Sequence, residues 1–309
     1  MQERLNLDRP AAEEWVSRYV SVTGETELVH DRPWSKVLRV PTEQGDVWFK
    51  ACAQTQRFEP RLTGELSKRW PNLIAEVLAY DEPRSWMLTA DAGSSLGNQG
   101  NPPETWLRIL PRYAELQIGE TAFAEDHLAH EVPDLRLVGL PEKFEELVER
   151  DDLPVDSADA KLLQGLTNRF ADMCERLDRF QIPASIQHDD LHIANVYETN
   201  GRARILDWGD ASVSHPFASL FVTFRFLEER NGFEPSDPWF DKLRDAYLEP
   251  WGSDLEGGFD LGLRVGAVAH AVAWLRQRDH LPAEARSDFD VGFRNILGRA
   301  LHAASHASS

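Results

Sequence analysis

The sequence predicts an α/β protein of the α+β kind, with a small N-terminal lobe of antiparallel strands and a larger, mainly helical C-terminal lobe. Two observations support this prediction. Short β-prone runs separated by proline and glycine recur between residues 28 and 89, whereas apolar residues recur at helical spacing in most segments after Thr105. Between these regions lies SSLGNQGNPPE, residues 94–104, which has the composition of a loop. We therefore expect two domains, residues 1–93 and residues 94–309.

The N-terminal lobe is expected to combine five strands with two helices. Proline and glycine separate the strands, and the second helix is indicated by apolar residues four positions apart. In chain order, the pattern predicts a helix at 10–20, strands at 28–30, 36–40 and 46–52, a helix around 58–66, and strands at 74–80 and 85–89.

The C-terminal lobe is expected to be built mostly from helices. Their predicted ranges are 105–121, 141–151, 157–180, 216–230, 236–248, 258–278 and 283–304. The last residues, HAASHASS, are expected to fray. The helix at 157–180 should turn one apolar stripe toward the core, formed by Leu162, Leu166, Phe170, Met173 and Leu177.

The charge of the chain limits the partners it can have. Its 33 basic and 52 acidic residues give a formal net charge of −19. Long-range repulsion argues against nucleic acid and anionic membrane surfaces, and it favours a cationic substrate. The cysteines, Cys52 and Cys174, are expected to be buried free thiols.

The start of the chain, MQERLNLDRPAAEEW, lacks the apolar segment of a signal peptide. No run of about 18 apolar residues, the length needed to span a membrane, is present in the sequence. We therefore expect a cytoplasmic protein that does not bind membranes. The sequence does not predict an oligomeric state.

The most informative stretch is SIQHDDLHIANVYETNGRARILDWGD, residues 185–210. Within it, HDDLHIAN at residues 188–195 fits H-x-D-L-x-x-x-N, the catalytic loop of protein kinases, and Asp207-Trp208-Gly209 fits the D-x-G that follows that loop. Phosphoryl transfer explains this spacing. One acidic side chain takes the proton of the attacking hydroxyl, while an asparagine and a second aspartate hold the magnesium ions that bridge the nucleotide phosphates.

The residues between these two motifs predict a β-hairpin. The runs 196–197 and 203–206 are β-prone, and Asn200-Gly201 between them is a strong hairpin signal. Asn195 should therefore lie just before one strand and Asp207 just after the other. The hairpin would bring these two candidate metal ligands together.

With these residues, the chain resembles the aminoglycoside phosphotransferase family of small-molecule kinases, whose catalytic loop typically reads H-G-D-L-H-x-x-N. The resemblance implies a protein-kinase-like fold of two lobes. It also implies transfer of the γ-phosphoryl group of ATP, or of GTP, with Mg²⁺, to a hydroxyl of a small acceptor such as an aminoglycoside, an amino alcohol, a choline-like alcohol or a sugar. The matching positions are His188, Asp190, Leu191, His192, Asn195, Asp207 and Trp208.

The resemblance also implies a role for each matching residue. Asp190 would be the catalytic base, His188 would brace the loop, and Asn195 and Asp207 would bind magnesium. Asp189 occupies the position where the family commonly has glycine, so it should point away from the acceptor.

In the N-terminal lobe, Lys50 lies at the end of the third strand, where a kinase places the lysine that contacts the nucleotide phosphates. Strand alternation puts Lys50 on the face opposite Phe49. The resemblance implies a partner for Lys50 on the next helix, and aligning that helix with the family pattern favours Glu59 over Glu65. Pro60 supports this choice, because proline fits the first turn of a helix that begins near Glu59.

Two further contacts to the nucleotide follow from the same resemblance. Backbone groups of Thr89 and Asp91 would bind the adenine edge. The glycine-rich loop of protein kinases is missing, and Pro33-Trp34-Ser35-Lys36 stands in its place, so Ser35 and neighbouring backbone N–H groups would contact phosphate there. A second departure lies at residues 215–220, HPFASL, where many relatives have D-P-x-x-D-L: His215 and Ser219 replace both aspartates.

Two other functions fit part of the pattern. His188 and His192, four residues apart, would share a metal in a phosphohydrolase if they lay on a helix, although the β-prone flanks argue against a helix there. A nucleotide-binding protein without catalysis would be expected to lack one of the chemical groups of the site. None of Lys50, Glu59, Asp190, Asn195 and Asp207 is missing.

Overall fold

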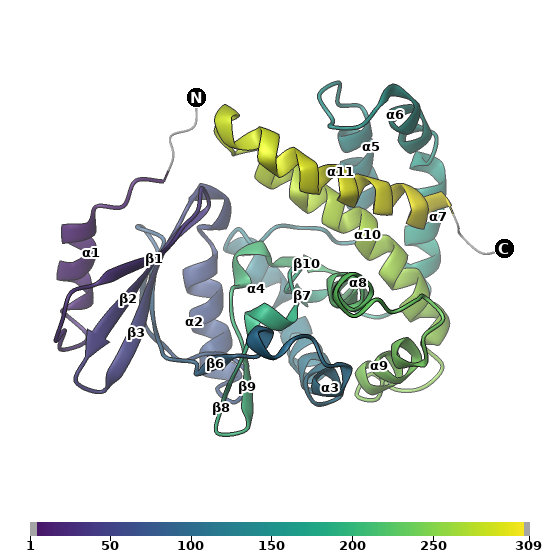
Figure 1. The fold of residues 1–309 in the computed structure, drawn as a ribbon. Coiled ribbons are helices and arrows are strands. Elements are labelled where there is room, and N and C mark those ends of the chain that lie inside the picture. Colours follow the sequence, from purple (N-terminus) through teal and green to yellow (C-terminus); the bar gives the residue numbers. More distant parts are fainter. Residues whose placement is uncertain (1–4, 306–309) are drawn as a thin grey trace. The chain divides into compact units, whose positions relative to one another are not determined.

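The computed structural model describes residues 5–305, which form two compact units (Figure 1). The first unit contains the chain up to Asn98, together with Ala194–Asp210 and His280–Ala285. The second contains Gln99–Ile193, Ala211–Asp279 and the residues from Arg286 onward. The antiparallel sheet in the N-terminal part and the mainly helical remainder confirm the predicted α+β class.

An antiparallel sheet of five strands is the centre of the first unit. Thr42 and Gly45 are paired across the tight turn between the second and third strands, where Gly45 has a φ of +112° that favours glycine. The strands are β1 (Glu27–Asp31), β2 (Ser35–Thr42), β3 (Gly45–Cys52), β4 (Val77–Asp81) and β5 (Trp86–Ala90), in the order β1-β2-β3-β5-β4.

Two helices cover opposite faces of this sheet (Figure 1). On one face, α1 (Arg9–Val16) packs Trp15 edge-on against Phe49 and Trp86, with ring centroids 5.9 Å apart in both pairs. On the other face lies α2 (Glu59–Arg69). The prediction for the first helix, residues 10–20, was too long, because the α-helix ends at Val16 and Tyr19 is 50% exposed.

The second sheet of the first unit contains the predicted hairpin. Its strands are β6 (Ser94–Ser95), β8 (Val196–Thr199) and β9 (Arg202–Ile205), in the order β6-β8-β9. Asn200 and Gly201 form the turn with φ values of +52° and +73°, the left-handed conformation that a two-residue hairpin turn requires. The hairpin prediction is confirmed.

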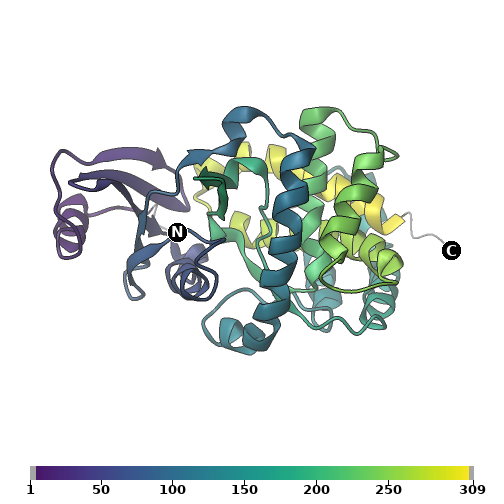
Figure 2. The same cartoon turned by 90° about the horizontal axis from the view of Figure 1, so that it is seen from below.

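The second unit is mainly helical. Helix α10 (Glu256–Asp279) packs against both α8 (Leu220–Asn231) and α9 (Pro238–Leu248), and these three are the green to yellow-green helices of Figure 2. A short two-stranded sheet pairs β7 (Ser185–Gln187) with β10 (Ser212–Ser214). The helices are α3 (Pro103–Glu120), α4 (Ala124–Ala129), α5 (Leu140–Val148), α6 (Ser157–Gln164), α7 (Thr167–Asp178), α8 (Leu220–Asn231), α9 (Pro238–Leu248), α10 (Glu256–Asp279) and α11 (Ala283–Ser305).

The helix predicted at 157–180 is wrong as a single element. It is divided into α6 and α7 at Gly165, a residue with low helix propensity. Because the direction changes there, Leu162 is 56% exposed, whereas Phe170, Met173 and Leu177 enter the core with residues of α5, α10 and α11. The apolar stripe was therefore correct only for its C-terminal part.

Other boundaries differ for local reasons. The strand predicted from residue 74 begins at Val77, and Ile74 forms only an isolated bridge with Ile205. The helix predicted at 216–230 starts as a 3₁₀ turn, Pro216–Ser219, before α8. In the tail expected to fray, His302–Ser305 is helical, and the remaining four residues lie outside the described part of the chain.

Both cysteines are buried free thiols, as predicted. Within residues 5–305, no helix is long and apolar enough to cross a membrane.

Candidate functional site

The first group of candidate residues lies in the first unit around Lys50. Strand alternation places Phe49 in the α1-covered core and turns Lys50 to the opposite face, as predicted. The Lys50 Nζ atom donates to Oε1 of Glu59 at 2.7 Å and to Oδ1 of Asp207 at 2.6 Å. One ammonium group therefore links strand β3, helix α2 and the segment after β9.

Burial strengthens the electrostatic attraction between Lys50 and its carboxylate partners. The Lys50 side chain is 10% exposed and that of Glu59 is fully buried. Burial alone would lower the pKa of Lys50, but the carboxylates of Asp207 and Glu59 raise it well above its usual value. Lys50 therefore keeps its positive charge, as a contact to phosphate requires.

Glu59, and not Glu65, is the partner of Lys50. Glu59 is the first residue of α2 and Pro60 follows it, a position where a helix tolerates proline. Glu65 of the same helix pairs instead with Lys68 at 2.9 Å and accepts a hydrogen bond from the Tyr80 hydroxyl of β4 at 3.5 Å. The predicted Lys50–Glu59 ion pair is present, and the Cys52 thiol adds a contact to Glu59 at 3.3 Å.

The β8–β9 hairpin brings Asn195 and Asp207 together. Val196 is paired with Ile205, and the N–H of Leu206 donates to the carbonyl of Asn195 at 2.9 Å. Asp207 has a φ of +64°, a left-handed conformation that aspartate tolerates better than most side chains. Local strand pairing thus brings the backbone of these two residues to the same end of the hairpin, although the whole hairpin separates them in sequence.

Gly209 has a packing role in the D-x-G motif. A Cβ atom at this position would lie 2.6 Å from Cδ of Gln56, a buried side chain whose amide donates to Asp210 at 3.2 Å. A side chain there would have to displace the Gln56 amide and its hydrogen bond to Asp210, which gives the third position of the motif a steric reason. Gln56 is one residue that sequence reasoning missed.

The donor atoms at the hairpin suit magnesium. Carboxylate and amide oxygens are the hard ligands that Mg²⁺ prefers, and it is usually bound by one or two carboxylates together with substrate phosphates. The Asp207 side chain is 53% exposed, so its carboxylate is accessible. In the described part of the chain, no group of three or more His, Cys, Asp or Glu side chains could hold a metal without such help.

The other candidate nucleotide contacts also lie in the first unit. Ser35 begins β2 opposite Cys52 and is 6% exposed. Thr89 lies within β5, paired with residues of β3 and β4. Asp91 follows the end of β5, and its carboxylate accepts a hydrogen bond from the Trp48 indole at 3.2 Å.

The second group, in the second unit, is the loop that follows β7. His188 is fully buried and its Nδ1 accepts from the backbone N–H of Asp190 at 3.3 Å. His192 Nε2 lies 3.2 Å from Oδ2 of Asp190, and its ring stacks on Phe226 of α8 at 4.5 Å. Thr223, also on α8, donates to the carbonyl of Leu191 at 2.7 Å. These contacts fix the backbone on both sides of Asp190.

Asp189 adopts a conformation that explains why glycine suits this position. Its φ is +58°, and its carboxylate accepts a hydrogen bond from the Ser212 hydroxyl of β10. Removal from water raises the pKa of Asp189 to about 7, although Ser212 opposes the shift. The side chain is thus directed to β10, a three-residue strand that the sequence did not predict.

His215 and Ser219, which replace two aspartates, form hydrogen bonds within the second unit. His215 Nδ1 accepts from the N–H of Phe217 at 3.3 Å and so caps the following turn, while burial lowers the pKa of His215 to about 3 and keeps the ring neutral. Ser219 is hydrogen-bonded to the hydroxyl of Tyr113, and that hydroxyl accepts from the N–H of His188 at 3.0 Å. Tyr113 connects Ser219 to the loop, a link that no local motif indicates, since Tyr113 is 75 residues from His188.

A family model matches the sequence of this chain, and solved structures match its fold. The model of the phosphotransferase enzyme family, APH, matches residues 28–258. No curated protein sequence matches the chain.

Solved structures show the same fold at low sequence identity. Choline kinase LicA from Streptococcus pneumoniae has 15% identity and a TM-score of 0.65, with 97% of this chain and 99% of that chain covered. An ethanolamine kinase from Plasmodium vivax has 15% identity and a TM-score of 0.64 over 91% of this chain and 81% of that chain. The GDP complex of aminoglycoside 2'-phosphotransferase-IIIa has 17% identity and a TM-score of 0.64, with 95% of this chain and 97% of that chain covered. The predicted protein-kinase-like fold is confirmed.

Proposed function

The chain belongs to the phosphotransferase enzyme family and is a phosphotransferase that acts on hydroxyl groups, and from this premise we propose a reaction in which ATP, or GTP in its place, phosphorylates a small alcohol. The observation that carries the proposal is the pairing of Lys50 Nζ with both Glu59 and Asp207. A buried lysine held between two carboxylates presents a fixed positive charge for the nucleotide phosphates.

Each candidate residue has one task in this proposal. Lys50, oriented by Glu59, binds phosphate oxygens, and Asn195 and Asp207 hold magnesium, which when bound neutralises charge on the phosphates. Asp190 takes the proton of the acceptor hydroxyl. The acceptor oxygen then forms its bond to the γ-phosphorus as the bond from that phosphorus to ADP breaks.

The remaining residues position these groups. His188 braces the catalytic loop through its contact with the N–H of Asp190. Ser35 with its neighbouring N–H groups would contact phosphate, and backbone groups near Thr89 and Asp91 would bind the adenine edge.

The acceptor class is the finer part of the proposal. Aminoglycosides, amino alcohols, choline-like alcohols and sugars are the candidates. The net charge of −19 favours a neutral or cationic acceptor during encounter.

The alternative of a histidine metal site has less support. His188 and His192 lie in the loop between β7 and the 3₁₀ turn Ile193–Asn195, and not on one helix face. Their partners are also different, since Nδ1 of His188 accepts from the Asp190 N–H while His192 contacts the Asp190 carboxylate.

Thermal melting with nucleotide tests the proposal. A ligand at about 100 times its dissociation constant stabilises the folded state by roughly 2.7 kcal/mol, so Mg-ATP or Mg-GTP should raise the melting temperature. The Lys50→Met variant should lose the shift. ADP release with and without a panel of hydroxylated acceptors then separates a kinase from a phosphohydrolase and from a protein that only binds nucleotide. No shift with either nucleotide at millimolar concentration would overturn the proposal.

A further inference from the structure

The second unit contains a cavity of about 970 Å³ that no residue of the proposed phosphoryl-transfer machinery lines. It is lined by residues of α8, α9, α10 and α11, and its apolar part includes Phe221, Phe224 and Phe259. Its volume is in the range of sites for small organic molecules.

The charged side chains of this cavity are not equivalent. Arg299 is paired with Glu228 and Glu229 at 2.9 and 3.0 Å, and Arg244 is paired with Asp241 and Asp245, both at 2.9 Å. These cations already have their counter-charges.

Arg225 differs from these arginines. Within residues 5–305, its guanidinium makes no hydrogen bond or ion pair, and its Nε is buried without a partner. The guanidinium carbon of Arg225 lies over the ring of Phe226, 5.0 Å from the ring centroid. A buried guanidinium donor without an acceptor costs free energy, so such a group in a native protein calls for an explanation.

His270 on α10 also has buried polar atoms without a hydrogen-bond partner. It is 7% exposed, and both ring nitrogens are buried without a partner in the described part of the chain. Its ring contacts Phe221, at 5.7 Å between centroids, and Phe221 lies one helical turn before Arg225 on the cavity-lining face of α8. Burial lowers the pKa of His270 to about 3, so the ring is neutral and offers one donor and one acceptor.

Helix α8 connects Arg225 to the catalytic loop. Arg225 packs on the ring of Phe226, and Phe226 stacks on His192, whose Nε2 lies 3.2 Å from Oδ2 of Asp190. His270 contacts Phe221 of the same helix. The carboxylate of Glu229 acts more strongly than that of Asp190 on the charge of Arg225, although neither is bonded to it. The donors that lack a partner therefore lie on or against the helix that packs on the Asp190 loop.

We propose that Arg225, assisted by His270, binds an anionic group of the acceptor, a carboxylate or a phosphate, while the acceptor's hydroxyl faces Asp190. An anion on Arg225 supplies the missing hydrogen-bond acceptor, and a guanidinium binds such groups in a bidentate manner. This inference rests on the proposed kinase function, and it replaces the neutral or cationic acceptor that net charge alone favours with an anionic one. The negative net charge of the chain repels an anionic acceptor as it approaches, whereas Arg225 attracts the anionic group once the acceptor is bound.

The test uses matched probes on the full chain with Mg-ATP. One set is 4-hydroxybutyrate, its amide and 4-amino-1-butanol, and a second is glycerol 3-phosphate and glycerol, so the two sets distinguish carboxylate from phosphate. Melting shifts measure binding without turnover, and ADP release measures kcat and KM. An anionic probe should bind and react better than its neutral or cationic counterpart.

Variants then test whether Arg225 and His270 bind the anionic group of the probe. Arg225→Gln should raise KM for the anionic probe by about 10- to 100-fold, the range expected for a hydrogen bond to a charged group, with little change in kcat or in KM for ATP. His270→Phe should raise the same KM by a smaller factor. Arg244→Gln is the matched control, because Arg244 lines the same cavity and is already paired with two aspartates.

Three outcomes would overturn the inference: neither anionic probe shifts melting or reacts better than its counterpart, Arg225→Gln leaves these effects unchanged, or Arg244→Gln reduces them equally. A normal Mg-ATP melting shift in the same samples would show that the kinase proposal survives this failure. Loss of the nucleotide shift in the unmodified protein would instead count against the kinase proposal itself.

Discussion

At the residue scale, two adjacent aspartates have different surroundings. Asp190 lies beside His192, whereas Asp189 is hydrogen-bonded by Ser212 in a left-handed conformation. Asp190→Asn keeps the shape but removes the proton acceptor, so turnover should fall by roughly 10² to 10⁴-fold with nucleotide binding retained. Asp189→Asn should change turnover much less. Turnover of both variants, with melting curves to exclude unfolding, checks this, and equal losses would contradict the assignment of Asp190 as base.

Asp189 should also make stability depend on pH. Its pKa is raised by burial to about 7, so ionising it in the folded state is unfavourable. The contribution of Asp189 to the free energy of unfolding is fully present below its unfolded pKa near 4, and this contribution is lost as the pH rises toward 7. Asp189→Asn, which cannot ionise and tolerates a positive φ, should therefore gain stability over the unmodified protein, and the gain should be about 1 to 2 kcal/mol larger at pH 8 than at pH 5.

Urea unfolding at both pH values measures the difference. Ser212→Ala is the matched control, since it removes the hydrogen bond to Asp189 and leaves the carboxylate. A gain for Asp189→Asn that is the same at pH 5 and pH 8 would show that charge is not the cause.

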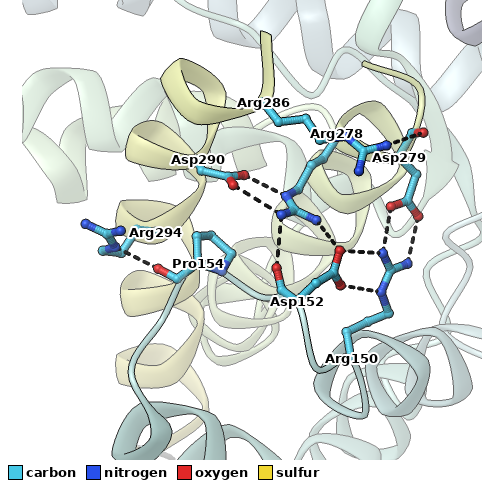
Figure 3. Close-up of polar contacts among 8 residues, drawn as sticks. All are labelled: Arg150, Asp152, Pro154, Arg278, Asp279, Arg286, Asp290 and Arg294. Carbon is cyan, nitrogen blue, oxygen red and sulfur yellow. Dashed lines mark hydrogen bonds and ion pairs between the residues drawn. The ribbon is translucent and has the colours of Figure 1, made fainter. Parts of the chain in front are cut away.

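At the element scale, an ion-pair network joins three segments of the second unit (Figure 3). Arg278, near the end of α10, contacts Asp290 of α11 at 2.6 Å and Asp152 of the loop between α5 and α6 at 2.8 Å. Arg150 contacts Asp152 at 2.8 Å and Asp279 at 2.9 Å. The Arg278 side chain is 7% exposed, so solvent screens its pairs little.

Replacing Arg278 by methionine should lower the free energy of unfolding at pH 7 by about 2 to 3 kcal/mol, because Asp290 would lose its counter-charge and Asp152 would keep only Arg150. Arg294→Met, which removes only a bond to the Pro154 carbonyl, should cost less than about 1 kcal/mol.

The same network predicts a pH dependence. Hydrogen bonds from Arg150 and Arg278 hold the pKa of Asp152 well below its usual value, so its contribution is present above the unfolded pKa near 4 and is lost as pH falls through the folded value. The difference between the unmodified protein and Arg278→Met should therefore shrink between pH 5 and pH 3 in urea unfolding. An undiminished difference at pH 3 would refute the electrostatic explanation.

At the scale of the whole molecule, the charge of −19 repels anions at long range. If the acceptor is anionic, added salt should screen this repulsion, and kcat/KM should rise at least about twofold between 20 and 200 mM NaCl. A cationic alcohol should show the opposite slope. Steady-state kinetics with 4-hydroxybutyrate and 4-amino-1-butanol measure both slopes, and slopes of the same sign would rule out steering by net charge.

Local sequence patterns were sufficient to predict some parts of the site. The hairpin between Asn195 and Asp207 follows from β-prone runs around Asn200-Gly201, and strand alternation determined the face of Lys50. Pro60 favoured Glu59 as the helix-start glutamate. Each of these depends on residues a few positions apart, where chain geometry leaves few choices.

Only the tertiary structure decided which distant side chains meet. Lys50 and Asp207 are 157 residues apart, and Tyr113 and Ser219 are 106 apart, so no spacing rule connects them. The unpaired state of Arg225 was equally invisible, because an arginine at helical spacing indicates a solvated face and only packing shows which cations lack a counter-charge. Burial and pairing depend on every element that surrounds a residue, and local sequence patterns do not contain that information.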